Sequence, residues 1–194
     1  MTVVYDFDKT LTYKDTLLDF FLEFSKNPFK ILFYFLLMVF AKLKLISNDS
    51  LKKWGVKLFL KGVSKEKLEQ KAEDYAKKIK TNTVYKEIDF KNRVLIVSAS
   101  FEEYLKPLFP ANVQIVASKL EYENNKVKGL LFNCYSKNKK TALKQLNILK
   151  INTLFTDSYS DVSLAEISEK TVVVKGDKIF VCNNLAEYKG CFNK

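Results

Sequence analysis

The stretch TVVYDFDKTLT, residues 2–12, decides the fold of this 194-residue chain. Its first half is a β-branched and aromatic run, which is typical of a buried strand. Asp6 and Asp8 follow where that strand would end, and ligands of open parallel sheets bind at this end of the strands. Residues two apart on an extended backbone point to the same side, so we expect the two carboxylates to lie together and to bind Mg²⁺. Paired aspartates are also common as solvated turn residues, so the motif needs support from the rest of the chain.

The rest of the chain alternates strand-like and helix-like segments. Strand patterns recur at residues 94–97, 113–116, 151–155, 171–174 and 178–182, with a hairpin at 120–132. Helix patterns recur at residues 101–108, 141–149 and 162–169. This alternation predicts an α/β fold built on a parallel, Rossmann-like sheet. Because residues 15–80 follow a helical pattern, we expect a core of residues 1–14 and 86–194 with an inserted all-helical cap at 15–85.

The composition excludes several classes of enzyme. Histidine is absent, which rules out Ser-His-Asp and Cys-His catalysis and every histidine-containing metal site. With five glycines, the chain has neither a GxxxxGK[ST] phosphate loop nor a GxGxxG dinucleotide motif. Acid–base work is therefore left to carboxylates, lysines or tyrosines. The three cysteines form no CxxC pair, so we expect reduced thiols and a cytoplasmic protein.

The net charge of +11 attracts anions such as phosphorylated metabolites, nucleic acid or an anionic membrane. The lysines are spread along the whole chain, and Arg93 is its single arginine. Nucleic-acid-binding proteins usually use more arginine, for bidentate contacts with bases and phosphates. We therefore expect no nucleic-acid partner, and a non-enzymatic anion-binding module is the contrasting hypothesis.

Two further polar clusters follow predicted strands. Residues 156–161, TDSYSD, contain two aspartates, and helix capping would explain one of them but not both. Residues 98–100, SAS, lead toward a helix, where a hydroxyl and free backbone N–H groups can hold a phosphate. Capping of that helix is the plainer explanation of Ser98 taken alone. A lysine from residues 137–144 could lie over the same phosphate and offset the charge of a nearby carboxylate.

Together, these segments resemble the motifs of the haloacid-dehalogenase superfamily, in its phosphoserine-phosphatase-like branch with a helical cap inserted after the first strand. DFDKTLT is similar to the first motif of that family, VLIVSAS to the second, NCYSKNK to the third and TDSYSD to the fourth. The resemblance covers essentially the whole chain. It implies an Mg²⁺-dependent phosphatase that hydrolyses phosphoric monoesters.

The resemblance also implies roles for the acidic residues of the first and fourth motifs. Asp6 would be the nucleophile and a metal ligand. Asp8 would be the general acid–base, and its backbone carbonyl would bind the metal. Asp157 would ligate Mg²⁺, while Asp161 would ligate it through water or orient the motif lysine.

The remaining site residues follow from the same resemblance. The motif lysine is best matched by Lys139, with Lys140 as the alternative. Thr10 would steady the loop of the first motif. Ser98 and Ala99 would bind the phosphate of the substrate.

The implied reaction passes through an aspartyl-phosphate. Asp6 attacks the phosphate, Mg²⁺ and Lys139 offset the repulsion between the two anions, and water then cleaves the intermediate. Asp8 would transfer protons in both steps, which requires a raised pKa. Lys9 and Ser136 depart from the family pattern, which often has Gly or Ser at the first position and Gly at the second. Neither change removes a catalytic group.

The identity of the substrate depends on the cap. Asp15 lies in the region that supplies an ammonium-binding glutamate in phosphoserine phosphatases. Those enzymes also use a cap arginine for the substrate's carboxylate, and residues 15–85 contain no arginine. An ammonium-binding carboxylate without that partner suits a phosphorylated amino alcohol or a similar small phosphomonoester, and a phosphoserine-like compound is the alternative.

The apolar segment ILFYFLLMVFA, residues 31–41, leaves three alternatives open. Eleven apolar residues are too few to span a bilayer, which needs ~20. The segment could be a buried cap helix, an oligomer contact, or a helix in a membrane interface whose flanking lysines face anionic headgroups. The last alternative, over residues 29–46, resembles the cap of bacterial phosphatidylglycerophosphatases. It would make the chain a lipid phosphate phosphatase, peripheral to the inner face of the membrane. The sequence does not determine the oligomeric state.

Overall fold

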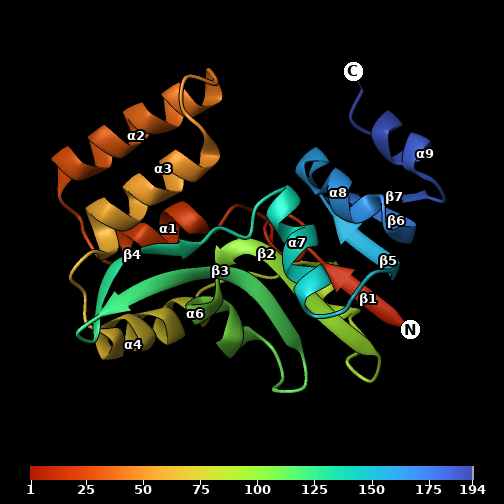
Figure 1. Ribbon diagram of the computed structural model, residues 1–194, viewed down its shortest axis with the longest axis horizontal. Helices are drawn as coiled ribbons and strands as arrows, with labels where there is room; N and C mark the ends of the chain where they lie inside the picture. Colours follow the sequence, from red (N-terminus) through yellow and green to blue (C-terminus); the bar gives the residue numbers. More distant parts are fainter. Residues whose placement is uncertain (194) are drawn as a thin grey trace.

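A single sheet organises the molecule. The computed structural model describes residues 1–193, and within them seven strands form this sheet in the order β4-β3-β2-β1-β5-β6-β7. Figure 1 shows β1, β5, β6 and β7 at one end of the molecule and the hairpin of β3 and β4 extending to the other. The strands are β1 (Thr2–Tyr5), β2 (Arg93–Phe101), β3 (Gln114–Glu123), β4 (Lys126–Phe132), β5 (Ile151–Thr156), β6 (Ser168–Lys175) and β7 (Lys178–Cys182).

The strand directions match the predicted fold class. β1 pairs in parallel with β2 and β5, and these pair in parallel with β3 and β6. The two outer pairs, β3 with β4 and β6 with β7, are antiparallel. Alternate residues of β1 face opposite sides of the sheet, so Val3 and Tyr5 join one hydrophobic cluster and Val4 joins the other. The prediction of an α/β fold on a mostly parallel sheet is confirmed.

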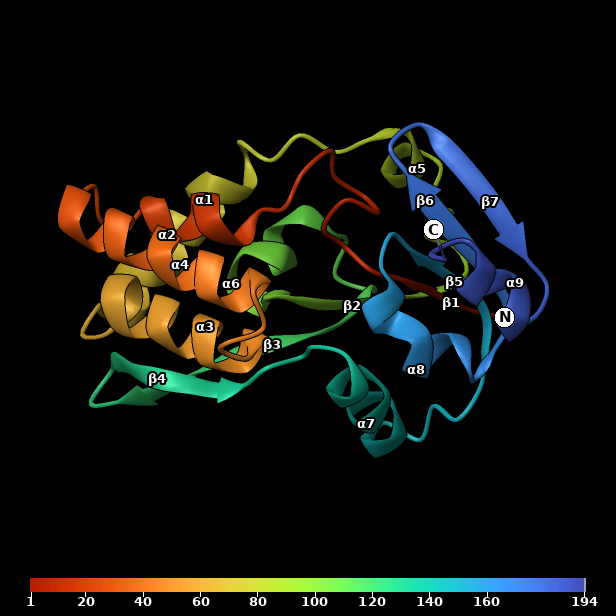
Figure 2. The same ribbon diagram turned by 90° about the horizontal axis from the view of Figure 1, so that it is seen from above.

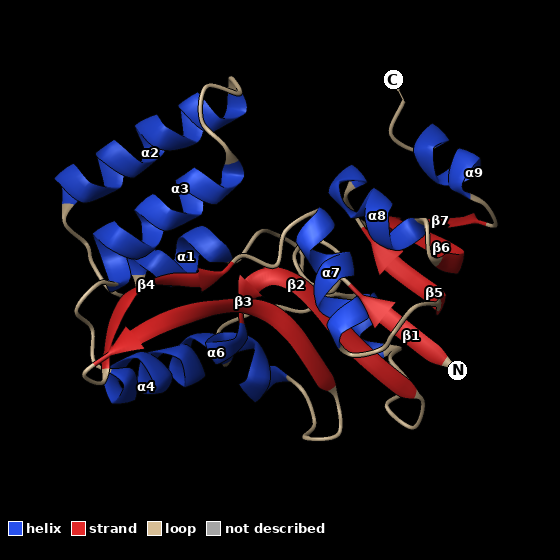
Figure 3. Ribbon diagram, viewed as in Figure 1, coloured by secondary structure: helices blue, strands red, loops and turns tan. Residues whose placement is uncertain are grey.

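Helices cover both faces of this sheet (Figure 3). Leu143, Leu164 and Tyr188, from α7, α8 and α9, pack with Val4 on one face. The helices are α1 (Leu17–Leu22), α2 (Pro28–Lys42), α3 (Asn48–Gly55), α4 (Lys65–Ala76), α5 (Thr83–Lys86), α6 (Glu102–Leu105), α7 (Lys137–Gln145), α8 (Val162–Ala165) and α9 (Leu185–Gly190). Shorter helical turns are η1 (Val56–Leu60), which is π-helical, and the 3₁₀ turns η2 (Lys106–Leu108) and η3 (Tyr159–Asp161).

Helices α1 to α4 lie between β1 and β2 in the chain and surround the outer half of the β3–β4 hairpin. Figure 1 shows α1, α2 and α3 on one side of this hairpin and α4 with α6 on the other, and Figure 2 shows β6, β7 and α9 at the opposite end of the molecule. The backbone N–H of Gly62 donates to the carbonyl of Val127 (2.8 Å), and Val127 N–H donates to Val63 (2.9 Å). The hairpin is thus hydrogen-bonded to the insertion. The division into a core and a cap at residues 15–85 stays a prediction.

Three local predictions need correction. The helix predicted at 141–149 ends at Gln145, because Asn147 adopts a left-handed φ of 58° and its neighbours close the helix with backbone hydrogen bonds to Leu143 and Lys144. The helix predicted at 162–169 ends at Ala165, because the chain turns there to begin β6 alongside β5. The strand predicted at 94–97 continues to Phe101, so α6 begins four residues later than Ser98.

Candidate active site

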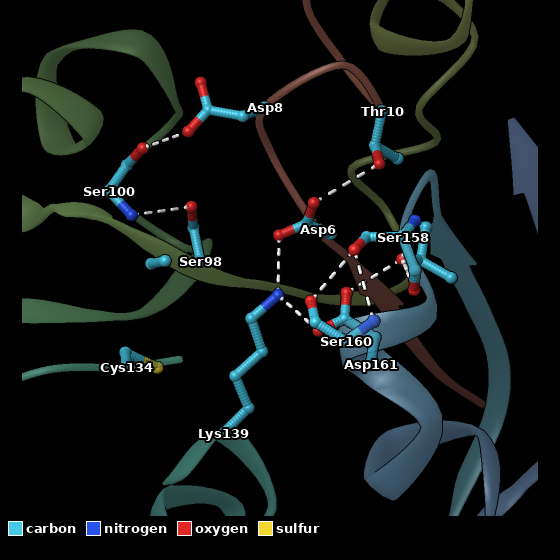
Figure 4. A network of polar contacts seen from close by, with 12 residues as sticks. Asp6, Asp8, Thr10, Ser98, Ser100, Cys134, Lys139, Ser158, Ser160 and Asp161 are labelled. Carbon is cyan, nitrogen blue, oxygen red and sulfur yellow. Dashed lines mark hydrogen bonds and ion pairs between the residues drawn. The ribbon is translucent and has the colours of Figure 1, made fainter. Parts of the chain in front are cut away.

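Asp6 lies at the carboxyl end of the central strand. Its backbone N–H donates to the carbonyl of Phe155 (2.9 Å), which ties the end of β1 to the end of β5. Because β2 and β5 flank β1 in parallel, their carboxyl ends bring Ser98 and Asp157 to the same edge of the sheet. The side chain of Asp6 is buried there. Because β1 lies between β2 and β5, the Asp6 carboxylate lies at the centre of the polar side chains of the site (Figure 4).

Lys139 reaches this carboxylate from α7. Its Nζ lies 2.7 Å from Asp6 Oδ1 and 2.7 Å from Asp161 Oδ1, and the whole residue is only 2% exposed. Burial alone would lower the pKa of Lys139, but the two carboxylates outweigh it and hold that pKa above its usual value. Lys140 instead pairs at the surface with Glu166 at 2.9 Å. The structure thus brings Lys139, and not Lys140, into contact with Asp6.

Asp161 orients the lysine and is itself held by Thr156. Thr156 Oγ1 donates to Asp161 Oδ2 at 2.8 Å, and both residues are fully buried. Asp161 Oδ1 accepts no hydrogen bond of good geometry among residues 1–193, although it lies at ion-pair distance from Lys139. One ammonium is therefore shared between two buried carboxylates, which leaves the cluster with excess negative charge.

The pKa values of the carboxylates reflect this excess. Burial raises the pKa of Asp6 to about 6, against the opposing effect of Lys139 and with a further increase from Asp161. Burial also raises the pKa of Asp157 to about 7, and the negative charge of Asp6 is the next largest cause. Within residues 1–193, the Asp157 side chain makes no hydrogen bond or ion pair. A cation between Asp6 and Asp157 would relieve both penalties.

The donor set fits magnesium. Among residues 1–193, no three acidic or thiol side chains form a ready-made metal site. Mg²⁺ does not need one, since it is usually held by one or two carboxylates, substrate phosphate and several waters. The carboxylate of Asp157, which has no partner in the described part of the chain, and the negative charge on Asp6 supply such a pair of hard oxygen ligands.

Asp8 points away from Asp6, contrary to the prediction that the two side chains lie together. β1 ends at Tyr5, and the following backbone turns so that Leu11 N–H donates to the carbonyl of Phe7 at 2.8 Å. Figure 4 shows the resulting separation, with Asp8 directed toward Ser100. The alternation of an extended strand therefore does not apply to this pair of residues.

Hydrogen bonds fix the carboxylate of Asp8 in its own position. Oδ2 accepts from Ser100 Oγ at 2.5 Å, and Oδ1 accepts from both the N–H and the hydroxyl of Thr16, at 2.8 and 2.6 Å. Burial raises the pKa of Asp8 to about 7, with a further increase from Asp15, while these hydrogen bonds act in the opposite direction. A carboxyl group with this pKa exchanges protons near neutral pH.

Thr10 and Ser98 flank the buried carboxylate as the sequence predicts. Thr10 Oγ1 lies 3.4 Å from Asp6 Oδ2, and Ser98 Oγ accepts from the N–H of Ser100 at 3.0 Å. Both residues are buried. Ser98 is part of β2, so the predicted phosphate cradle at a helix N-terminus is wrong, and any phosphate contact of Ser98 comes from the end of a strand.

Lys9 and Ser136, the two departures from the family pattern, both have left-handed backbones. Lys9 has a φ of 58°, and Ser136, directly before α7, has φ 53° and ψ −123°. Glycine adopts such conformations most readily, so a side chain at either position is strained. Lys and Ser in place of the family's small residues therefore strain the backbone at these two positions, but Asp6 and Lys139 remain in contact.

A cavity of about 210 Å³ opens beside Asp8. Asp8, Asp15, Ala99 and Ser100 line it from the loop after β1 and from β2. The insertion and the segment before α7 complete its wall with Leu17, Tyr34, Asn48, Leu51, Lys52, Asn133 and Tyr135. Asp15 and Ala99 thus line the same cavity, and their contacts with a substrate stay a prediction.

Lys52 is the residue of this cavity that the sequence interpretation missed. It is only 4% exposed, and its ammonium donates to Ser118 Oγ (3.0 Å), Asn133 Oδ1 (2.9 Å) and the carbonyl of Ala99. Burial lowers the pKa of Lys52 to about 8, and every hydrogen-bond acceptor it has in the described residues is uncharged. The sequence did contain one signal for this burial: Lys52 precedes the buried residues Gly55 and Val56 by three and four positions, so the three lie on the same side of a helix.

The fold and the site together define an α/β protein with a buried carboxylate–lysine centre at the carboxyl ends of parallel strands. The family model for haloacid dehalogenase-like hydrolases matches residues 3–166. The chain therefore belongs to this family of hydrolases, which confirms the superfamily and the enzyme class expected from the motifs. No curated protein matches the chain significantly in sequence.

Several solved structures share the fold. A Bordetella pertussis protein of unknown function is similar with a TM-score of 0.69 and 16% identity, over 89% of this chain and 88% of that one. A phosphoserine phosphohydrolase-like protein of Francisella tularensis gives 0.64 and 20%, over 99% of both chains. The phosphoserine phosphatase of T. onnurineus gives 0.62 and 17%, over 98% and 92%. At these identities the likeness shows the fold, which this chain shares with the two phosphoserine-phosphatase-type structures.

Proposed function

We propose that the protein is an Mg²⁺-dependent phosphomonoesterase that acts through an aspartyl-phosphate on Asp6. The observation that carries this proposal is the buried contact of Asp6 with Lys139 at the carboxyl end of β1. A carboxylate that attacks a phosphate ester meets electrostatic repulsion, and a fixed ammonium beside it reduces that repulsion. Membership in a hydrolase family supports the same chemistry.

Magnesium would be held by the carboxylates of Asp6 and Asp157 and by the backbone carbonyl of Asp8. Asp161 would contact the ion through water or act only by orienting Lys139, as its 2.7 Å ion pair supports. When bound, the ion supplies positive charge to the phosphate oxygens and to the attacking carboxylate. The raised pKa values of Asp6 and Asp157 are consistent with a cluster that gains from an added cation.

The proposed reaction has two steps. An oxygen of Asp6 bonds to phosphorus, the bond from phosphorus to the alcohol oxygen breaks, and Asp8 donates its proton to that oxygen. Water then bonds to phosphorus, Asp8 takes a proton from the water, and the bond to Asp6 breaks to release inorganic phosphate. The pKa of Asp8, about 7, lets this group serve as acid and then as base. Lys139 stays charged throughout, because its pKa is raised.

The cavity beside Asp8 supports a small substrate. A volume of about 210 Å³ admits a compact alcohol group, and its wall carries Asp15 and Lys52. The lack of a cap arginine favoured a phosphorylated amino alcohol from sequence alone. Lys52 supplies a second charged anchor in that pocket, so we favour a phosphoserine-like compound, whose ammonium would face Asp15 and whose carboxylate would face Lys52.

An activity assay with and without Mg²⁺ tests the proposal. Purified protein should hydrolyse p-nitrophenyl phosphate and O-phosphoserine, and chelation by EDTA should abolish both activities. Asp6→Asn should lower kcat by ~10³-fold or more. Asp74→Asn, at an exposed aspartate of α4, is the matched control and should leave kcat unchanged. Full turnover by Asp6→Asn, or turnover that EDTA does not affect, would contradict the proposal.

A lipid phosphate is a second candidate substrate. The observation in its favour is the exposed apolar side of α2, which includes Phe29 and Leu32. Tyr34, on the same helix, lines the cavity beside Asp8. Assays on a short-chain phosphatidic acid alongside O-phosphoserine would decide between the candidates, and a preference for the lipid by kcat/KM would replace the small-molecule proposal.

A further inference from the structure

The outward side of α2 is an apolar surface that the other described residues leave largely exposed. Phe29 is 81% exposed and Leu32 is 70% exposed. Figure 1 shows α2 as the outermost helix of the insertion, with α3 between it and β4. The α2 outer face, as we name this surface, consists of the exposed residues Phe29, Leu32, Phe33, Phe35, Leu36, Val39 and Leu43.

The other side of the same helix is already buried. Tyr34 packs edge-on against Phe21 and Phe59, with ring centroids 5.6 Å apart in both pairs. Gly55 allows this packing, because a Cβ there would lie 2.4 Å from the ring of Phe21. Helix α2 is therefore held in the fold mainly by this buried side, and Phe33 is the residue of the outer face whose ring also packs within the protein, against Trp54. A helix that is apolar on all sides is normally covered on all sides, so the outer face calls for a partner.

The charges around this face indicate which partner it is. Residues 24–48 contain no acidic residue, although the chain as a whole has 22. Lys26 precedes α2, Lys42 lies in its last turn, and Lys44 follows it, and all three are exposed. A second copy of the chain placed on the same face would bring lysines against lysines. An anionic surface matches the lysines and the apolar face together.

We propose that the α2 outer face docks on an anionic lipid bilayer, with the helix lying in the plane of the interface. The 15 residues of α2 extend about 22 Å, which is shorter than the ~30 Å hydrocarbon core. No helix within residues 1–193 is long and apolar enough to cross a membrane. The apolar side chains would enter the boundary between headgroups and acyl chains, and the flanking lysines would contact lipid phosphates. This docking is independent of the phosphatase chemistry.

Trp54 provides a built-in probe of this docking. It is the single tryptophan of the chain, and its ring contacts Phe33 of the α2 outer face at 5.8 Å between centroids. The ammonium of Lys57 also lies over the Trp54 ring, with Nζ 4.5 Å from the ring centroid. Entry of Phe33 into the interface would remove water from around Trp54, so its fluorescence should shift to the blue and resist aqueous quenchers.

The test titrates the full chain with vesicles of phosphatidylglycerol and phosphatidylcholine mixed, and with vesicles of phosphatidylcholine alone. We expect the Trp54 shift and co-sedimentation with the anionic vesicles only. Leu32→Glu with Leu36→Glu should weaken this binding by ~tenfold or more, because it removes apolar contact and adds negative charge. Leu149→Glu, at a loop leucine that is 65% exposed, is the matched control and should bind as the unaltered protein does.

Three outcomes would overturn the proposal. Equal binding to neutral and anionic vesicles, or no binding to either, contradicts an anionic bilayer as the partner. A dimer of the unaltered protein in lipid-free sedimentation that the Leu32→Glu, Leu36→Glu variant loses would assign the face to a second copy instead. Thermal unfolding of each variant shows that it is folded, and Lys42→Glu with Lys44→Glu offers a second, surface-only change that should weaken anionic binding.

Discussion

Two buried lysines, Lys139 of α7 and Lys52 of α3, experience opposite electrostatics. Lys139 lies between the carboxylates of Asp6 and Asp161, and its pKa is raised. Lys52 is hydrogen-bonded to neutral oxygens, and its pKa falls to about 8. Two carboxylates contact the first charge directly, whereas no carboxylate in the described residues lies at ion-pair distance from the second. From this difference we expect Lys139 to act at the reacting centre and Lys52 to pair with an anionic group of the substrate.

Replacing Lys139 should have the largest effect on both activity and stability. Lys139→Met leaves two buried carboxylates without their shared ammonium, so we expect kcat to fall by ~10³-fold and the free energy of unfolding by about 3–5 kcal/mol. Steady-state kinetics and urea unfolding measure these losses. Lys140→Met, which removes only a surface pair with Glu166, should change kcat by less than ~2-fold. Similar losses in both variants would contradict the distinction between the two lysines.

Replacing Lys52 should affect substrate selection more than chemistry. Lys52→Met should lower kcat/KM for O-phosphoserine by ~10- to 100-fold and leave that for phosphoethanolamine, which lacks the carboxylate, nearly unchanged. Lys53→Met is the matched control, because Lys53 lies next to Lys52 but pairs at the surface with Asp49 at 2.7 Å. An equal loss on both substrates would show that Lys52 acts on the structure of the site and not on the substrate's carboxylate.

The pH dependence of stability should also differ between the two lysines. The folded pKa of Lys52, about 8, lies below its unfolded value, so burial of its charge destabilises the fold below pH 8. That penalty is relieved as the pH rises from 8 toward 10. The stability of the unaltered protein relative to Lys52→Met should therefore increase by roughly 1–2 kcal/mol between pH 7 and pH 9.5. Lys139 contributes no change over this range, because its pKa is raised. A difference that is constant with pH would contradict an uncompensated charge at Lys52.

The smallest predicted effect concerns the backbone at Ser136, directly before the helix that carries Lys139. Ser136 has a left-handed φ of 53° directly before α7, so Ser136→Gly should stabilise the fold by about 1 kcal/mol without changing kcat. Thr141→Gly, in the exposed interior of the same helix, should lower stability by about 0.5–1 kcal/mol. Thermal unfolding of the two variants should thus move in opposite directions, and a destabilised Ser136→Gly variant would show that its backbone is not strained.

The cluster of side chains around Asp6 could be anticipated from the sequence because the motifs that supply it are local. Strand composition followed by Asp6 or Asp157 marks the carboxyl ends of β1 and β5, Ser98 lies in the last part of β2, and the topology brings these segments together. The direction of Asp8 could not be predicted in this way. It depends on a backbone turn after Tyr5 and on two hydroxyl donors, Thr16 from the following loop and Ser100 from the distant strand β2.

Lys52 could not be identified by the same local reasoning. The chain has 33 basic residues, and the burial of this one arises from the packing of α3 against the β3–β4 hairpin, which the sequence pattern did not show. The choice between Lys139 and Lys140 likewise depended on where α7 begins. The cap boundary at 15–85, a cytoplasmic location and the lack of a nucleic-acid partner stay predictions.

Detection of phosphate on Asp6 tests the central claim most directly. Protein mixed with O-phosphoserine and Mg²⁺, quenched in acid within the first turnover and digested, should yield a phosphorylated peptide that contains Asp6. Asp6→Asn should yield none, and the Lys139→Met protein should form it far more slowly. Turnover of the unaltered protein without phosphate on this peptide, or with phosphate on another residue, would contradict the account.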